Sequence, residues 1–247
     1  RPRHEPQTKL PPLISSQRLL NGHKGCQSGI APCTLGARTT DGVNMTRLIM
    51  IRHGETNWNV EQRKQGRNDQ PLNEKGQAQA QLAADYAKAT FNITKVWSSP
   101  LQRCASTAAS FDLPVATSDH LLEIDYGSWE GMLDSEIAAR QPERFRNGGI
   151  SMDPPGGEER SNLPVRARTW IHESKIADEK GDVVLVGHGT AMKGLLVALL
   201  GLPDHAMENF EIYNCSVTTI EINPLNNGGN RLATLNYTAH LATTNGT

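Results

Sequence analysis

The chain has 247 residues, enough for one sizeable domain, with 37% hydrophobic residues and a formal net charge of -1. A chain with this net charge lacks the excess of positive charge that non-specific nucleic-acid binding needs. It also contains no run of about 18 apolar residues, the length needed to span a membrane. We therefore expect neither a nucleic-acid partner nor a membrane segment. The cysteines show no CxxC spacing, which disfavours a zinc site or a disulfide framework and makes the cytoplasm the expected location: Cys26, Cys33, Cys104 and Cys215.

Residues 1–44 differ in composition from the rest of the chain. They are rich in Pro, Gly, Ser and Arg, and hold six Lys or Arg against two acids, which leaves 19 basic and 24 acidic residues beyond them. We expect a poorly ordered extension, either a targeting segment or sequence from an expression vector or upstream translation. The second origin is favoured because Met45 leads straight into the first strand. Residues 45–247 are expected to form a single domain.

The first strong pattern is the apolar run at residues 48–51, which predicts a buried strand. Arg52, His53 and Gly54 follow where this strand ends. Ligands of parallel α/β sheets bind beyond the carboxyl ends of the strands, and a glycine there lets the backbone approach a ligand closely. An arginine beside a histidine at such a point indicates an anion site.

A polar and irregular stretch at residues 57–69 comes next in the chain. Asn73 is then a predicted N-cap for a helix over residues 74–88. Apolar residues recur in this segment at helical spacing, which predicts a surface helix laid on a sheet: Ala78, Leu82, Ala83 and Tyr86.

Residues 95–98 predict a second strand. A helix should begin directly after it, with Pro100 in the first turn, where a missing N–H is harmless, and with Arg103 close behind. A short edge strand is predicted at residues 113–116. The following loop, residues 121–131, is unusually dense in acidic and aromatic side chains.

The middle of the chain predicts helices at residues 133–140 and 163–178, separated by a region with a Pro154-Pro155-Gly-Gly turn. This region has no strand pattern. We interpret it as a helical insertion that covers the carboxyl edge of the sheet.

The second half repeats the arrangement of the first strand. Residues 182–186 are a buried-strand run, followed by Gly187-His188-Gly189 and by a helix that ends at Leu200 with Gly201 as its cap. Two further strands are predicted near residues 216–222 and 232–236. Strands alternating with helices of this length favour a three-layer α/β/α fold with a mostly parallel sheet and the active site at the carboxyl ends of its strands.

Two strands that each end in His-Gly make a purely structural role for both histidines improbable. If Arg52, His53, Arg103 and His188 converge, the two guanidinium groups match phosphate oxygens and disfavour protonation of a neighbouring imidazole. A neutral His53 can then attack phosphorus to give a phosphohistidine. The second histidine would stabilise charge on the transferred group.

The same scheme needs an acid for the leaving group, and the loop at residues 121–131 supplies candidates. Glu123 is preferred because apolar neighbours would raise its pKa toward the working range. Asp125 and Glu130 are competitors, and composition alone does not rank the three.

The ordered motifs resemble those of the histidine phosphatase superfamily, also called phosphoglycerate mutase-like, from about Arg47 to Leu241. The motifs are Arg52-His53-Gly54-Glu55-Thr56, Trp58-Asn59, Gln65-Gly66, Pro71-Leu72 with Gly76, Ser98-Ser99-Pro100-Leu101-Gln102-Arg103, Leu122-Glu123, Tyr126-Gly127, Trp129-Glu130-Gly131 and Gly187-His188-Gly189. The resemblance implies His53 as the phosphorylated nucleophile and Glu123 as the proton donor. It implies a phosphate pocket of Arg52, Arg103 and His188, with substrate-binding positions at Asn59, Gln65, Gly66 and Gly189.

Within that family the sequence is similar to the small phosphatases, so we expect a metal-independent phosphomonoesterase acting on a small phosphorylated metabolite. A cofactor-dependent phosphoglycerate mutase or bisphosphatase is the alternative. Mutases of the family usually carry adjacent arginines for the glycerate carboxylate, whereas Arg140, Arg144 and Arg146 are spaced apart here. A non-catalytic module that binds phosphorylated ligands is a more distant alternative, disfavoured because nucleophile, arginines, second histidine and acid are all present.

A metal hydrolase could instead use His53, His188, Glu123 and Asp125 as ligands. Two arginines beside the same site would repel a cation, and no HxH or HExxH spacing occurs. We therefore expect no metal and no cofactor. A homodimer is a further expectation.

Overall fold

The computed structural model describes residues 39–40, 43–44, 46–140, 142, 145–146, 149–150, 153–224 and 229–245, all within the unit Pro32–Thr247. Strands β1 (Thr39–Thr40) and β2 (Val43–Asn44) pair antiparallel. The rest of the predicted extension at residues 1–44 lies outside the described residues. In the described part of the chain, no helix has both the length and the apolar character needed to cross a bilayer.

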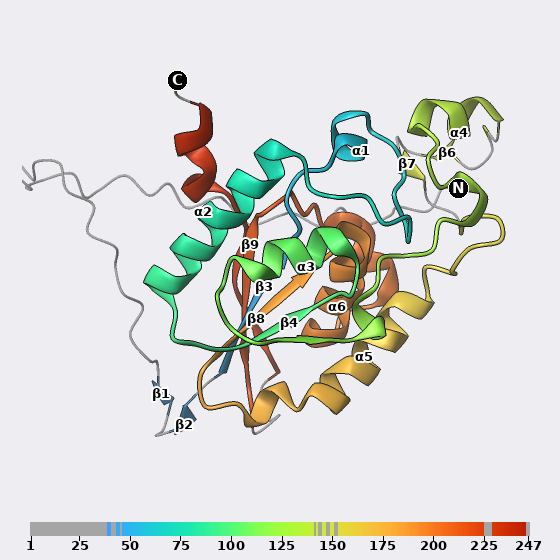
Figure 1. Cartoon of the computed structure of the whole chain (residues 1–247). Helices are drawn as coiled ribbons and strands as arrows, with labels where there is room; N and C mark the ends of the chain where they lie inside the picture. The colour runs from blue at the N-terminus through green and yellow to red at the C-terminus, as the bar shows by residue number, and fades with distance from the viewer. Residues whose placement is uncertain are drawn as a thin grey trace, which may run out of the picture. The chain divides into compact units, whose positions relative to one another are not determined.

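A six-stranded mixed sheet organises the domain, in the order β10-β9-β3-β8-β4-β5 (Figure 1). Its strands are β3 (Thr46–Arg52), β4 (Ile93–Ser98), β5 (Val115–Thr117), β8 (Asp182–Gly187), β9 (Val217–Ile222) and β10 (Arg231–Tyr237). From β3 through β8 and β4 to β5 the pairing is parallel, while β9 pairs antiparallel with both β3 and β10. The prediction of a mostly parallel sheet is confirmed.

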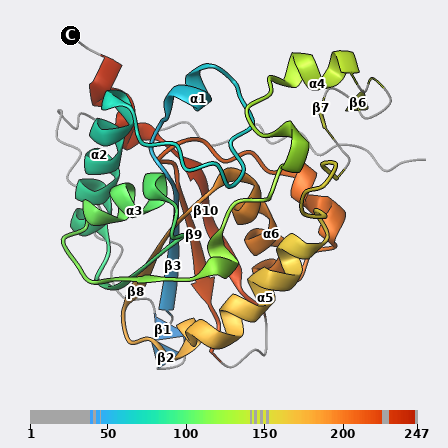
Figure 2. The same cartoon turned by 45° about the vertical axis from the view of Figure 1, so that its right-hand side comes forward.

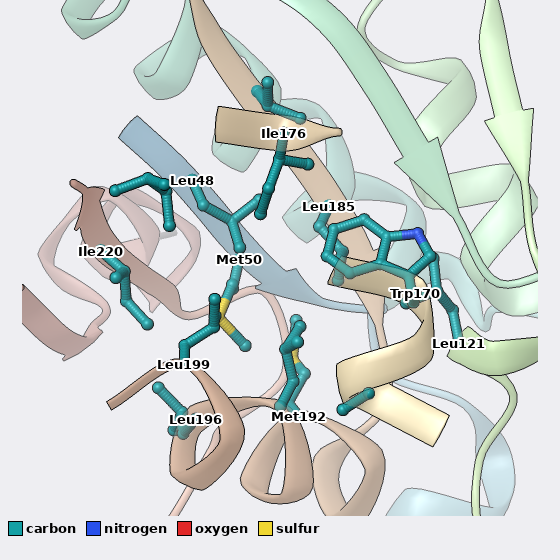
Figure 3. Close-up of a cluster of buried hydrophobic side chains, with 14 of the residues drawn as sticks. Leu48, Met50, Leu121, Trp170, Ile176, Leu185, Met192, Leu196, Leu199 and Ile220 are labelled. Carbon is teal, nitrogen blue, oxygen red and sulfur yellow. The ribbon is translucent and has the colours of Figure 1, made fainter. Parts of the chain in front are cut away.

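Because side chains alternate along a strand, β3 contributes to two separate apolar cores. Leu48 and Met50 belong to the core under α5 (Asn162–Ser174) and α6 (Gly189–Leu200), and Figure 3 shows Met50 pointing toward Leu199 and Met192 of α6. Ile49 and Ile51 belong to the opposite core under α2 (Glu74–Thr90) and α3 (Gln102–Ala109). The predicted three layers are therefore present, with these helices on both faces of the sheet (Figure 2).

Helix α2 begins where the sequence predicts it, because the side chain of Asn73 accepts the backbone N–H of Gly76 at 2.7 Å. The face that it buries agrees only in part with the predicted one. Ala83 is buried and Tyr86 packs against the core, whereas Ala78 is exposed. The buried residues are mostly small: Gly76, Gln79, Ala80, Ala83, Ala84 and Ala87. Such small residues let α2 lie close to the backbone that follows β3. The approach is so close that a Cβ atom on Gly54 would overlap the Gly76 carbonyl.

Three short segments depart from the predictions. Residues Asn57–Val60, expected to be irregular, form helix α1, which the side chains of Thr56 and Asn59 cap reciprocally. Helix α3 begins at Gln102, so Pro100 precedes the helix, although Arg103 does lie in its first turn. The longer helix predicted at residues 163–178 ends at Ser174, because Lys175 adopts a left-handed conformation with φ of 50° before a short 3-10 turn.

The predicted insertion begins with α4 (Asp134–Arg140), which lies near α1 at the carboxyl end of β3 (Figures 1 and 2). Where no strand was predicted, β6 (Phe145–Arg146) and β7 (Gly149–Ile150) pair antiparallel over two residues each. A two-residue ladder has too few positions to show an alternating pattern in the sequence.

Candidate active site

A cavity of about 320 Å³ lies at the carboxyl end of β3 and beside the first residues of α6. Its volume suits a small molecule. The described lining residues come from four parts of the chain: Arg52, His53, Asn59, Arg63, Lys64, Gln65 and Gly66; Arg103; Glu123 and Tyr126; and Gly189, Thr190, Lys193, Glu211, Ile212 and Tyr213. Most of the predicted site residues are therefore brought together.

The ring of His53 is fixed through one nitrogen, and the other has no hydrogen bond to any residue that the structure describes. Its Nδ1 lies 2.8 Å from the backbone carbonyl oxygen of Gly54. A carbonyl oxygen can only accept, so Nδ1 carries the proton and Nε2 keeps its lone pair. Burial lowers the pKa of His53 well below its usual value, and the charges of Arg52 and Arg103 lower it further. The ring is therefore neutral at physiological pH, and His53 lines the cavity.

The backbone around His53 is held by segments distant in sequence. Its N–H donates to the Gly187 carbonyl at 2.9 Å, and the Gly54 N–H donates to the Thr107 hydroxyl at 3.1 Å. The Asn214 amide donates to the carbonyl of His53 at 2.8 Å. No sequence motif marks Asn214, which lies between a 3-10 turn and β9.

The two predicted arginines occupy the cavity in different ways. Nη1 of Arg52 donates to the Ile212 carbonyl at 2.7 Å, and its buried Nε has no partner in the described structure. Arg103 is fully buried and donates to the carbonyls of Gly66 at 2.7 Å and Asn68 at 2.8 Å. Burial lowers the pKa of both guanidinium groups from their usual value.

His188 caps the start of α6 and is fully buried behind the cavity wall. Its ring lies edge-on to that of His53, with 5.3 Å between centroids. Nε of Arg103 donates to its Nδ1 at 3.2 Å, so its Nε2 carries the proton and donates to the Ser99 hydroxyl at 2.8 Å. Burial, and then the charge of Arg103, lower the pKa of His188 well below its usual value. Both ring nitrogens of His188 are occupied.

Of the three acidic candidates, Glu123 alone lines the cavity. Its carboxylate accepts the backbone N–H groups of Thr190 at 3.1 Å and Ala191 at 2.9 Å, in the first turn of α6. Asp125 accepts the Gly127 N–H, and Glu130 accepts the Arg67 N–H. Glu123 is therefore held against α6 in the cavity wall, whereas Asp125 and Glu130 bind backbone groups outside the described lining.

The four predicted substrate-binding positions all line the cavity. The side-chain oxygen of Asn59 caps α1 through Thr56 and also accepts from Asn214, which leaves its amide nitrogen for a ligand. Gln65 is almost fully buried, and its Oε1 has no partner among the described residues. Gly66 has φ of 53°, and Gly189 lies against the Arg52 side chain without crowding it.

Lys193 is a lining residue that the sequence reasoning passed over. It lies in a helix otherwise interpreted as apolar from Met192 to Leu200, and a single charge within such a run was the available signal.

Among the described residues, no group of three or more His, Cys, Asp and Glu side chains could hold a metal ion.

The sequence profile described as the histidine phosphatase superfamily, branch 1, matches residues 48–238 of this chain. The chain belongs to the histidine phosphatase superfamily. The family prediction is therefore confirmed. With it, the prediction of a phosphatase acting on phosphoric monoesters is also confirmed.

Three comparisons place this histidine phosphatase among its relatives. Phosphoserine phosphatase 1 of Hydrogenobacter thermophilus is 31% identical over 204 residues, which cover 80% of this chain and 95% of the relative. A probable phosphoglycerate mutase of Enterobacter sp. (strain 638) is 33% identical over 72% of this chain and 85% of its own length. The structure of a mutant phosphoserine phosphatase from Entamoeba histolytica in complex with phosphoserine has a TM-score of 0.68 at 29% identity, covering 80% of this chain and 100% of that one.

Proposed function

We propose that this chain is a metal-independent phosphomonoesterase that hydrolyses small phosphate monoesters through a phosphohistidine on His53. The observation that carries the proposal is the fixed tautomer of His53. Its protonated Nδ1 is bound to the Gly54 carbonyl, and its unprotonated Nε2 lies in a cavity that Arg52 and Arg103 also line. A neutral imidazole beside fixed cations is what attack on a phosphate dianion requires.

In the first step, Nε2 of His53 attacks phosphorus, a P–N bond forms, and the ester P–O bond breaks. The leaving alkoxide takes a proton from Glu123. In the second step, Glu123 takes a proton from water, whose oxygen attacks phosphorus as the P–N bond breaks. Inorganic phosphate leaves, and His53 and Glu123 return to their starting protonation states.

Glu123 must be released from α6 to act in this way. In the structure it accepts the N–H groups of Thr190 and Ala191, and the N-terminus of a helix is also a site that binds phosphate. Phosphate oxygens that take over these donors would free the carboxyl group to meet the leaving oxygen. Phosphate binding and proton donation are thereby coupled.

Arg52 and Arg103 supply the charge that stabilises the transferred phosphoryl group. Arg103 is held by Gly66 and Asn68 on one side and His188 on the other, so its charge needs little reorganisation during the reaction. His188 acts in this scheme mainly through Arg103, because its ring nitrogens are already bound.

A phosphoglycerate mutase is the second candidate function, because a 33% identical relative bears that name. Both reactions begin with the same phosphohistidine. They differ in whether water or the hydroxyl of a bound product takes the phosphoryl group.

The experiment measures phosphate release, with EDTA present, from phosphoserine, 3-phosphoglycerate, ribose 5-phosphate and an aryl phosphate. We expect release that persists in chelator, disappears in His53→Ala and is unchanged in His205→Ala, a matched control at an exposed histidine. Loss of activity in EDTA, or its retention in His53→Ala, contradicts the proposal. Interconversion of 2- and 3-phosphoglycerate without phosphate release would establish the mutase instead.

The proton donor is tested separately with matched glutamate variants. Glu123→Gln should lower kcat strongly for an alkyl phosphate and weakly for an aryl phosphate, whose leaving group needs no proton. Glu130→Gln should behave like the parent protein, since Glu130 lies outside the cavity lining. Equal losses with both substrates would remove Glu123 from the donor role.

A further inference from the structure

The loop before β9, residues 212–215, holds Arg52 at both ends. The Ile212 carbonyl accepts a hydrogen bond from Nη1 of Arg52 at 2.7 Å. The backbone N–H of Cys215 donates to the Arg52 carbonyl at 2.9 Å. The proposed mechanism needs the guanidinium group at a fixed place beside phosphate, and that place therefore depends on where this loop lies.

The same loop fixes the backbone beside the ring of His53. The side-chain amide of Asn214 donates to the His53 carbonyl at 2.8 Å and to the Gly54 carbonyl at 3.3 Å. The Gly54 carbonyl also accepts the Nδ1 proton of His53, so Asn214 and the ring share one acceptor. A shift of the loop would therefore move the oxygen atom that sets the tautomer of the ring.

The shape of this loop needs support from outside it. Cys215 is fully buried and has a left-handed backbone, with φ of 52°. A residue with a Cβ atom adopts that conformation at a cost, and it persists only where surrounding contacts fix it. The C-terminal part of the chain supplies such contacts. The side-chain oxygen of Asn236 accepts the Tyr213 N–H at 2.8 Å, and Nε2 of His240 lies 3.0 Å from the Cys215 carbonyl oxygen.

Two aromatic rings orient His240. It belongs to the 3-10 helix η6 (Ala239–Asn245), which lies beside α2 near the C-terminus (Figures 1 and 2). Its ring stacks on Tyr86 of α2, with 5.0 Å between centroids and 16° between planes, and on Tyr237 at 5.7 Å. Because a carbonyl oxygen only accepts, Nε2 carries a proton and donates it to Cys215. Burial lowers the pKa of His240 from its usual value, so the ring is neutral near pH 7.

We propose that His240 is a positioning residue of the active site, which holds Arg52 and His53 in their reactive arrangement through the carbonyl of Cys215. The inference rests on the proposed phosphatase function and extends its machinery to the C-terminal segment, since His240 is outside the described cavity lining. The two stacked tyrosines keep the imidazole at the donor position. A role in packing alone would need the ring of His240 but not its N–H.

The test separates the ring of His240 from its N–H. His240→Phe keeps an aromatic ring between the tyrosines but offers no donor to Cys215, so kcat for an aryl phosphate should fall about tenfold or more. His240→Gln loses the ring but keeps an amide N–H at a similar reach, and it should recover most of kcat. His240→Leu, compared with His240→Gln, repeats the comparison without a ring in either variant, should His240→Phe fail to fold.

Asn230→Ala is the control for lost stability. It removes side-chain hydrogen bonds to the Leu199 carbonyl and the Asn223 N–H, at the end of β9 and β10 far from Tyr237. Its kcat should stay within about twofold of the parent value, and urea unfolding shows that each variant is folded in the assay. An equal loss of kcat in His240→Phe and Asn230→Ala overturns the proposal. So does a kcat in His240→Gln as low as that in His240→Phe.

A spectroscopic readout separates this proposal from the proposed function, because it needs no turnover. Nitrogen NMR of the imidazole rings reports the tautomer of His53, which in the parent should carry its proton on Nδ1. The His53 signals should shift toward a mixture of tautomers in His240→Phe and stay unchanged in His240→Gln and Asn230→Ala. Such a shift supports the positioning role even if the parent releases no phosphate. Phosphate release with unchanged kcat and unchanged His53 signals in His240→Phe leaves the phosphatase in place and rejects the positioning role.

Discussion

The ends of β3 and β8 carry the same short pattern, a buried strand followed by His-Gly, yet the two histidines are placed differently. His53 has one ring nitrogen bound to the next carbonyl and the other free at the cavity wall. His188 has one nitrogen bound to Arg103 and the other to Ser99, and it lies behind the wall. Burial lowers the pKa of both rings well below the usual value.

Under the proposed mechanism, neither the sequence pattern nor the protonation state distinguishes the nucleophile His53 from the supporting His188. Both rings are neutral and buried. The two rings differ in the partners of their nitrogens. His188 is bound by Arg103 of α3 and by Ser99 in the loop before α3, whereas His53 is bound by the carbonyl of the next residue, Gly54. The following predictions test that assignment.

The largest effect is expected at the free ring nitrogen. His53→Asn removes the nucleophile and should lower kcat by about 10⁴-fold or more. Rapid quenching with radiolabelled substrate should trap an acid-labile phosphoenzyme in the parent and none in this variant. Label on His188 in place of His53 would reverse the comparison.

Arg103→Lys should lower kcat by about 10²- to 10³-fold, because a lysine cannot hold Gly66, Asn68 and His188 at once. Steady-state kinetics with an aryl phosphate measures the effect. Arg67→Lys serves as a control at an exposed arginine outside the cavity lining. Equal activity in both variants would show that the position of the Arg103 charge does not matter.

Stability should fall as pH falls below about 6.5. Both histidines have a folded-state pKa below the unfolded value. As the pH falls, the unfolded chain therefore binds protons before the folded one does, and this stabilises the unfolded state relative to the folded state. Two such groups change the free energy of unfolding by about 2.7 kcal/mol per pH unit. Urea unfolding between pH 7 and pH 5 measures this slope, and His188→Asn should reduce it by about half. An unchanged slope in that variant would show that His188 is not held neutral.

The smallest effect is expected at the partner of the supporting ring. Ser99→Ala leaves the buried N–H of His188 with only the weak acceptor Cys104 Sγ at 3.4 Å and should lower the free energy of unfolding by about 1–3 kcal/mol. The activity of the folded fraction should fall only a fewfold. Urea unfolding and kinetics on the same sample give both values. A loss of activity as large as that of His53→Asn would make His188 a direct participant.

The sequence predicted the sheet well because its strands are strongly patterned. The runs before Arg52 and before His188 are continuously apolar, and a strand buried on both faces needs such a run. Helix α2 was found from Asn73, whose capping contact is local. Arg52, His53 and His188 followed from strand ends, since the carboxyl ends of parallel strands meet at one edge. The substrate-binding positions followed from the family resemblance.

What the sequence did not provide depends on contacts between distant segments. The buried face of α2 was predicted only in part, because Ala and Gly carry little hydrophobic signal and the close approach of Gly76 to Gly54 joins distant segments. The sequence already favoured Glu123 over Asp125, but its contacts with the first turn of α6 join segments more than 60 residues apart and leave no local signal. Asn214 acts through the backbone of His53, which is far away in sequence, so no local pattern marks it.

The position of β3 also bears on how the enzyme matures during synthesis. β3 is the first strand of the sheet to be translated, yet both of its neighbours, β8 and β9, come from beyond residue 182. Both edges of β3 stay unpaired until the C-terminal third of the chain has emerged from the ribosome. The carbonyl of His53 likewise lacks its hydrogen bond from Asn214 until then. A nascent chain therefore cannot acquire phosphatase activity gradually, and a ribosome that stalls before β9 leaves an apolar strand exposed to chaperones and proteases.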